Sequence, residues 1–290
     1  MRTAMNRFDP IYDVQFMPDR SLRLPSKSYI PALQQSPLYQ KLLRPFPYST
    51  KNLILRLSQF AEINHSFADP HVRRLVMIML EQNWTPQGFA LMQDSADIDA
   101  VYNAIQTTLL IRLGLPDHDL LRVGINAILN TQPMRCQGAE FNPGKMGHQQ
   151  KVTCIHSITK SLIALSIYQD RYPEKWTFRM QEKLDEGLDY LLFNDLFLDH
   201  RSDLDLQHLV FPFYPQASWL EMLRLMRDQS RLKHPGCRKA LQWLQSHQQE
   251  DQYWYSSQAA TLPGWVQFDD TYEPSLWITH LADDILRQAA

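Results

Sequence analysis

The stretch DPHVRRLVMIMLEQNWTPQG at residues 69–88 contains a helix together with its start and stop signals. Asp69 and Pro70 form a typical helix start, because an Asp side chain can cap the first turn and Pro lacks an N–H that the turn would leave unpaired. After them, apolar residues recur every three or four positions and so share one helix face. The stretch therefore predicts an amphipathic helix over 70–82 that ends in a Pro- and Gly-containing turn.

The same pattern recurs along the chain, and the 9 glycines and 18 prolines favour helices with firm stops over twisted sheets. The predicted helix pairs are 70–82 with 98–113, 117–132 with 153–168, 176–194 with 215–230, 236–249 with 273–287, and a less regular pair at 30–44 and 50–63. A period of roughly 50 to 60 residues is typical of helical-hairpin repeats. We divide the chain into an N-terminal arm with an irregular first helix, 1–48, and a single domain, 49–290.

The second helix of each pair is the more apolar one. Residues 155–168 carry a single formal charge, Lys160, whereas 176–194 has a broad polar face. A closed two-layer ring encloses one helix of each pair and exposes the outer flank of the other. We therefore expect an all-α fold, an (α/α) toroid or barrel of about five helical hairpins with inner and outer helix rings. A stacked solenoid is the alternative.

Composition limits the partners. The net charge of −2 provides no basic surface for nucleic acid, and no apolar run approaches the roughly 20 residues of a membrane span. The charged segment 1–24 lacks the apolar block of a signal peptide, so we expect a cytoplasmic protein without a transmembrane segment. The three cysteines, an odd number, are interpreted as thiols.

Three phrases of the repeat resemble a known family. They are Asp69-Pro70 with LEQNW at 80–84, GCRKALQWL at 236–244 with Gln248-Gln249 and Trp254, and PSLWIT at 274–279. They are similar to the repeats of the prenyltransferase and squalene-cyclase family, over about residues 50–288. The resemblance implies an (α/α) toroid with a central cavity lined by inner helices and functional groups near one end of the ring.

Parallel inner helices would bring their N-termini to one rim, where free N–H groups favour anions. The candidate catalytic residues lie at or near these helix starts: Asp99, His156, Tyr214, Asp269 and Asp270. Paired carboxylates at Asp99 and Asp270 would also suit a carbohydrate-active (α/α) barrel if opposite helix starts face each other.

A second group of residues has the chemistry of zinc ligands. Cys136, His148, Cys154 and His156 lie within about twenty residues, although their spacing matches no zinc finger. In the protein prenyltransferases that the repeat resembles, a zinc-binding Asp-x-Cys opens an inner helix, and Cys154 occupies that position with Val152 in place of the aspartate. We predict zinc ligands at Cys136, Cys154 and His156. The alternative is that the cysteines are simply buried.

The string FDDTYE at 268–273 resembles the magnesium-binding motif of class I terpene synthases, with Asp269 and Asp270 as its carboxylates. No second metal-binding motif accompanies it, and capping of the following helix explains the aspartates equally well. Magnesium is therefore less favoured than zinc. The Asp-x-Asp-Asp motif of class II cyclases has only an incomplete counterpart, DLDL at 203–206.

Aromatic rings would suit stabilisation of a carbocation, because a ring face attracts positive charge. The predicted substrate-binding residues are Phe211, Phe213, Trp219, Glu221 and Trp277. Glu221 is interpreted either as an inward acid with a raised pKa or as part of an outward salt bridge. Trp84 and Trp243, at repeat positions, are expected to pack between hairpins.

Two functional hypotheses follow. The first is a terpenoid-cyclase or prenyltransferase-like enzyme that holds a hydrophobic, isoprenoid-type small molecule in the central cavity. The second is a non-catalytic toroid that binds a lipid or a partner peptide, which the incomplete catalytic motifs favour.

Overall fold

The computed structural model describes residues 9–11, 15, 29–91, 98–115, 118–135, 148–200, 206–213, 216–257, 262–269 and 272–290, with only the backbone at 118, 148–154 and 199–200. These parts are mostly helical, and their paired strands are the two-residue β1 (Trp84–Thr85) and β2 (Gly88–Phe89). The structure thus confirms the all-α class. None of the described helices is long and apolar enough to cross a membrane.

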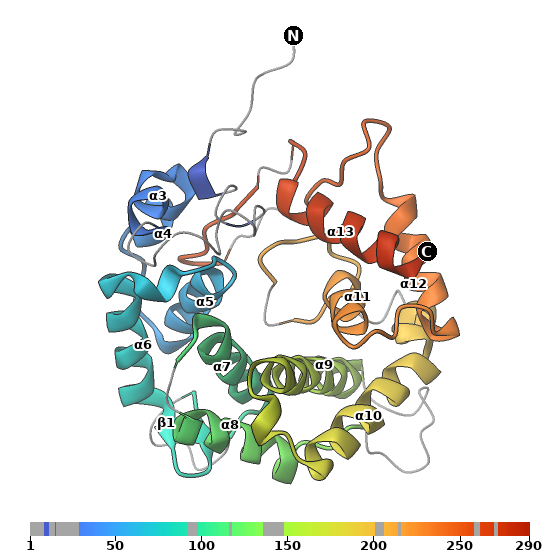
Figure 1. Ribbon diagram of the computed structural model, residues 1–290, viewed down its shortest axis with the longest axis horizontal. Coiled ribbons are helices and arrows are strands. Elements are labelled where there is room, and N and C mark those ends of the chain that lie inside the picture. The colour runs from blue at the N-terminus through green and yellow to red at the C-terminus, as the bar shows by residue number, and fades with distance from the viewer. Residues whose placement is uncertain are drawn as a thin grey trace.

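Five helices follow one another around the middle of the molecule (Figure 1). They are α5 (Thr50–Ala61), α7 (Ala100–Leu113), α9 (His148–Arg171), α11 (Trp219–Asp228) and α13 (Leu276–Ala289), and each contacts the next. We call these the inner helices. They are the second helices of the predicted pairs, which the sequence distinguished by their apolar character.

A second set of helices lies outside the first (Figure 1). It consists of α3 (Tyr29–Gln35), α4 (Pro37–Leu43), α6 (Pro70–Asn83), α8 (His118–Thr131), α10 (Phe178–Phe193) and α12 (Arg238–Ser246). The predicted helix over 30–44 is two helices, because Pro37 starts a new one and Ser36 caps it by accepting from the Tyr39 backbone N–H at 3.0 Å.

The first and last parts of this arrangement meet through a loop. Arg56 of α5 donates to the carbonyl of Gly264 at 2.6 Å, and the side-chain amide of Gln59 exchanges two hydrogen bonds with the backbone of Val266. Segment 262–269 therefore connects α5 to the part of the chain that leads into α13.

Close packing between the two layers explains a glycine within α10. A Cβ added at Gly187 would lie 2.5 Å from Cδ2 of Leu162 in α9, so a larger residue would force the helices apart.

Trp243 of α12 is buried, as expected for packing between hairpins. Trp84 is 41% exposed, so the packing prediction was wrong for that residue, which belongs to the β1–β2 hairpin that follows α6 and not to the helix itself.

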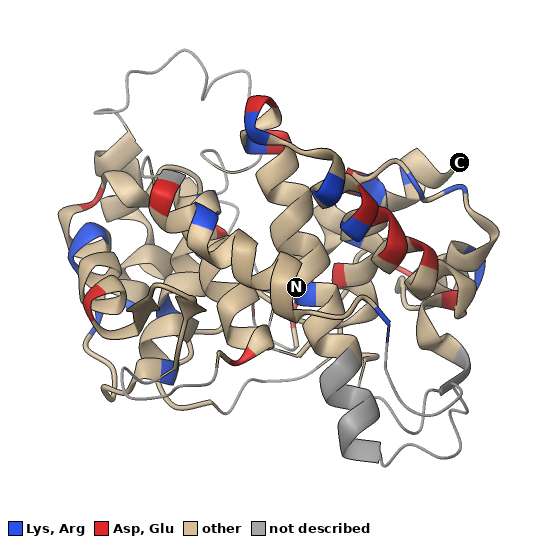
Figure 2. Cartoon of the chain, turned by 90° about the horizontal axis from the view of Figure 1, so that it is seen from below, with Lys and Arg blue, Asp and Glu red and all other residues tan. Residues whose placement is uncertain are grey.

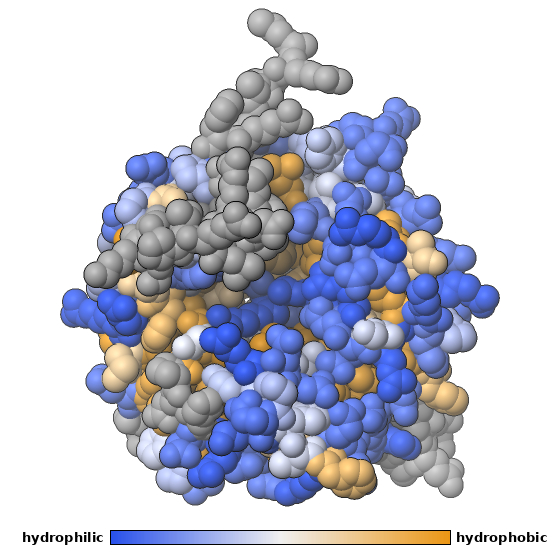
Figure 3. Space-filling view, viewed as in Figure 1, coloured by the Kyte–Doolittle hydropathy of each residue, from blue (hydrophilic) through white to orange (hydrophobic). Residues whose placement is uncertain are grey.

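The outside of the molecule carries charges of both signs (Figure 2). On the face seen in Figure 3, polar side chains cover most of the described surface, and apolar side chains are visible between them toward the middle. This distribution is that of a two-layer helical protein whose apolar residues face inward.

Candidate functional site

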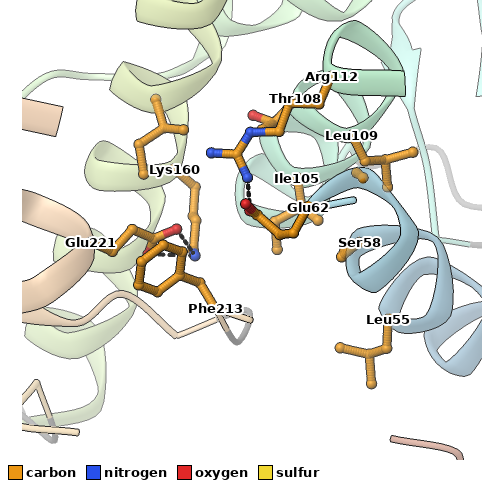
Figure 4. A pocket seen from close by; sticks show the side chains of 12 residues that line it. Leu55, Ser58, Glu62, Ile105, Thr108, Leu109, Arg112, Lys160, Phe213 and Glu221 are labelled. Atoms are coloured by element: carbon orange, nitrogen blue, oxygen red, sulfur yellow. Dashed lines mark hydrogen bonds and ion pairs between the residues drawn. The ribbon is translucent and has the colours of Figure 1, made fainter. Parts of the chain in front are cut away.

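A cavity lies among four of the inner helices, and one of its walls is apolar (Figure 4). Leu55 comes from α5, Ile105 and Leu109 from α7, Ile163 from α9, and Phe213 from the segment before α11. The free space beside this wall is small, about 40 Å³. It suits a short apolar group.

Opposite charges meet at the edge of this wall. The ammonium group of Lys160 donates to both carboxylate oxygens of Glu221, at 2.7 and 2.6 Å, and both side chains are almost completely buried. Burial lowers the pKa of Lys160, and the adjacent Glu221 opposes this change. Glu221 therefore forms an inward ion pair, a combination of the two interpretations that the sequence left open.

A second carboxylate, Glu62 at the end of α5, binds two guanidinium groups. Oε1 of Glu62 accepts from Nη1 of Arg112, and Oε2 accepts from Nη1 of Arg224 at 3.0 Å. Arg112 lies near the end of α7 and Arg224 in the second half of α11. One carboxylate thus holds two arginines from different helices.

We call Glu62, Arg112, Lys160, Glu221 and Arg224 the central charge cluster. Burial and then the nearby Arg224 lower the pKa of Arg112 to about 9, which still leaves it protonated at neutral pH, and burial lowers the pKa of Arg224. The cluster contains three basic and two acidic side chains. Such a group is expensive to remove from water, so its presence inside the molecule points to a function.

A larger, polar cavity of about 540 Å³ lies on the other side of the two arginines. Its remaining lining comes from the second halves of α9 and α11 and the residue after α11: Ser166, Ile167, Gln169, Asp170, Asp228 and Gln229. The amide of Gln229 donates to Ser166 at 2.8 Å and to Gln169 at 3.2 Å, which connects the two walls. Arg112 lines both this cavity and the apolar one.

Three of the predicted aromatic residues come together. Phe211 stacks on Trp277 with centroids 5.1 Å apart, and its ring contacts Phe213 edge to face at 5.5 Å. Phe268 completes the group through Phe211 and Trp277. We call these four residues the aromatic cluster. Phe213 also lines the cavity and so connects the aromatic cluster to it. The centroid of its ring lies 5.7 Å from the guanidinium carbon of Arg224.

Trp219, the remaining aromatic candidate, is completely buried in the core. It packs edge to face on Trp243, and its indole N–H donates to the carbonyl of Leu196 at 3.1 Å. It is not among the residues that line the described cavities. Its contacts are those of a packing residue.

Asp269 lies beside the aromatic cluster, next to Phe268 in the chain. Its Oδ2 accepts from the hydroxyl of Ser275 at 2.5 Å, and Ser275 also caps α13. Burial raises the pKa of Asp269 to about 7, although the Ser275 hydrogen bond acts in the opposite direction. This carboxyl group can therefore hold or release a proton near neutral pH. Asp270 and Tyr214 lie outside the described residues.

Asp99 has a structural role at the start of α7. Its carboxylate accepts from the backbone N–H of Tyr102 at 3.0 Å and is exposed to solvent. This is the N-cap interaction that the sequence pattern predicts. It does not line the described cavities.

The predicted zinc ligands are described only in part. His156 is buried, and its Nδ1 accepts from the backbone N–H of Ala217 at 3.0 Å, so that nitrogen is already in use. Cys136 and the side chain of Cys154 lie outside the described residues. Over the parts that the structure describes, His, Cys, Asp and Glu side chains form no group of three or more that could hold a metal. Cys237 is a buried thiol, as expected, and burial raises its pKa to about 12.

Of the central charge cluster, sequence reasoning predicted only Glu221 as a site residue and missed Glu62, Lys160 and the two arginines. The sequence contained a signal for these residues, because each is an isolated charge within, or at the end of, an otherwise apolar helix face. Arg112 stands between Ile111 and Leu113, for example. Such isolated charges are usually explained by surface exposure, and only the fold brings them to one place.

Comparison with known proteins yields no match: no protein-family model fits the chain, and no curated protein or solved structure is significantly similar to it. The family resemblance of the repeats therefore stays a prediction.

Proposed function

We propose that the chain is an (α/α) toroid of the prenyltransferase and squalene-cyclase type that binds a small amphipathic molecule in its central cavity. The observation that carries the proposal is the meeting of five ionisable side chains from the inner helices beside an apolar wall. The apolar part of the ligand contacts Leu55, Ile105, Leu109 and Phe213. The polar part lies toward the central charge cluster.

The contacts between consecutive inner helices and the hydrogen bonds of α5 to segment 262–269 support the toroid. The resemblance of the repeats supports an isoprenoid as the apolar part. The small space beside the apolar wall favours a short chain over a long one.

In the enzymatic form of the proposal, Asp269 is the proton donor. A carboxyl group with a pKa of about 7 is still partly protonated at neutral pH. It would transfer its proton to an alkene carbon, and the ring faces of Phe211 and Trp277 would stabilise the resulting cation. The cation would close a C–C bond with the second alkene and return a proton to the Asp269 carboxylate, so that the net reaction is an isomerisation. Phe213 connects this cluster with the cavity.

The binding experiment uses a short neutral isoprenoid, geraniol, and isothermal titration calorimetry. We expect binding by the wild type and at least roughly tenfold weaker binding by Ile105→Trp, which fills the apolar part of the cavity. Phe178→Ala, at an exposed position on the outer helix α10, is the control and should bind like the wild type. Equal binding by all three proteins, or none, would overturn the proposal.

Turnover separates the enzyme from the non-catalytic alternative. The protein is incubated with geranyl diphosphate, and cyclic isomers that retain the diphosphate, as expected for a reaction that starts with protonation of an alkene, are quantified by mass spectrometry. Products that disappear in Asp269→Asn while geraniol binding persists support the enzyme. Binding without products supports a toroid that carries a lipid or a partner peptide.

Zinc remains a proposed cofactor at Cys136, Cys154 and His156, with magnesium the less favoured metal. Elemental analysis of the purified wild type and of Cys154→Ala tests it. One zinc per chain that is lost in the variant would make Cys154 a ligand, and a zinc-free wild type would rule out the site.

A further inference from the structure

The pair of arginines held by Glu62 has hydrogen-bonding capacity to spare. A guanidinium group has five N–H donors, and among the hydrogen bonds of the described residues each of these two arginines uses only Nη1, toward Glu62. The shared carboxylate brings the two groups close together, and Arg224 lowers the pKa of Arg112. The remaining donors are available to a ligand.

A ligand can reach these donors from the polar cavity. Arg112 and Arg224 both line this cavity of about 540 Å³, and their side chains are 16% and 22% exposed. Both arginines also line a narrow space together with the apolar residues Ile163, Ile167 and Leu225. The cavity is therefore large enough for a small ion that contacts both groups.

The arginines are surrounded by charges of both signs. Glu62 binds both guanidinium groups, and Glu221, although paired with Lys160, also raises the pKa of each arginine. Two further carboxylates, Asp170 and Asp228, line the polar cavity. Both are exposed residues, and Asp228 accepts hydrogen bonds from Arg227 and also raises the pKa of Arg112 and Arg224. An anion in this cavity is therefore bound through the unused N–H groups of the arginines and not through an excess of positive charge.

We propose that Arg112 in the last turn of α7 and Arg224 in the second half of α11, positioned by Glu62, form a binding site for a phosphate group. Planar guanidinium groups bind phosphate oxygens through paired, charge-assisted hydrogen bonds. The inference deepens the proposed function, because the site lies where the polar end of an amphipathic ligand would be. The phosphate is either a free ion or the head group of such a ligand.

The first test measures binding of inorganic phosphate by isothermal titration calorimetry at constant ionic strength. We expect the wild type to bind phosphate, and Arg224→Gln to bind it roughly tenfold more weakly or not at all. Arg231→Gln is the matched control, because Arg231 forms an ion pair with Asp185 and does not line the cavity. Equal weakening in both variants would mean a general charge effect and would overturn the site.

The variant Glu62→Gln is expected to raise the affinity for phosphate, whereas Arg224→Gln lowers it. Glu62 competes with a ligand for the two arginines, so its neutralisation should tighten phosphate binding several-fold even though the protein becomes less stable. A merely structural ion pair predicts no gain in affinity. Circular dichroism checks that each variant is folded. Unchanged or weaker phosphate binding by folded Glu62→Gln would overturn the proposal.

Geranyl phosphate distinguishes the two sources of the phosphate group. Binding at least tenfold tighter than that of inorganic phosphate, and weakened by both Ile105→Trp and Arg224→Gln, would identify the head group of an amphipathic ligand. Equal affinities would identify a site for free phosphate. Geraniol binding without phosphate binding would overturn this inference alone, and the reverse result would overturn the proposed apolar ligand alone.

Discussion

Arg224 and Arg227 stand three residues apart on α11, yet they belong to different environments. Arg224 turns to the cavity and binds Glu62, whereas Arg227 binds Asp228 and Asp284 toward the outside of the molecule. Exposed pairs of the second kind contribute about 0 to 1 kcal/mol. Buried pairs of the first kind are costly to desolvate. Replacing both members of such a pair by apolar side chains often leaves a protein equally stable or more stable. The comparison teaches that stability alone does not account for the central charge cluster.

The largest effect is expected when one partner of the most buried pair is removed. Lys160→Met leaves the Glu221 carboxylate without its cation, and we expect the free energy of unfolding to fall by about 3 to 5 kcal/mol. Urea denaturation measures this change. The double variant Lys160→Met/Glu221→Leu should recover most of the loss, because it removes both charges together. A single variant within about 0.5 kcal/mol of the wild type would contradict the comparison.

Asp269 extends the comparison to a buried carboxyl group hydrogen-bonded to a hydroxyl. Its native pKa of about 7 lies above the unfolded value, so the native state holds an extra proton between about pH 4 and pH 7. Stability therefore decreases as the pH rises through this range. Relative to Asp269→Asn, the wild type should lose about 2 to 3 kcal/mol between pH 5 and pH 8. Urea unfolding of both proteins at the two pH values measures it, and a constant difference would show that the pKa is not raised.

Asp99 represents a charge with a local structural role. Asp99→Ala removes the cap of α7 and should lower the free energy of unfolding by about 1 kcal/mol. Asp99→Ser keeps a side-chain oxygen that can cap the helix, so this variant should retain most of that stability. Thermal denaturation compares the three proteins. Loss of product formation in Asp99→Ser, with stability preserved, would instead support the catalytic role predicted from the sequence.

The smallest effect is expected at the outer pair. Arg227→Gln breaks the ion pairs with Asp228 and Asp284, which are partly exposed, and should cost only about 0.2 to 1 kcal/mol. If Arg227→Gln lowered the free energy of unfolding as much as Lys160→Met, the inner and outer charges would not differ in their contribution to stability.

Much of the helical framework could be predicted because its signals are local. Apolar residues at helical spacing and stops at Gly114 and Pro133 located α6, α7 and α8 to within about two residues. The start of α9 was placed five residues late, because 148–152 is polar and lacks an apolar stripe. The aromatic group was predicted in part, since Phe211, Phe213 and Trp277 meet, whereas Phe268 was not among the predicted residues.

The candidate site was much less predictable. The sequence directed attention to the N-terminal rim of the inner helices, where charged and metal-binding residue types are concentrated. Of the central charge cluster only Glu221 lies in a first turn, that of α11, whereas Arg112 is in the last turn of α7 and Arg224 in the second half of α11. Partners in this cluster are separated by 50 to 162 residues, and no local pattern relates them.

The sequence by itself determined the helical class, the positions of most helices, and the distinction between apolar second helices and amphipathic first helices. These properties depend on the spacing of residues within one or two helical turns, which is visible along the chain. The tertiary structure alone decided which isolated charges meet. Ion pairs across a cavity depend on the rotation and depth of several helices at once, and these follow from the packing of the whole molecule.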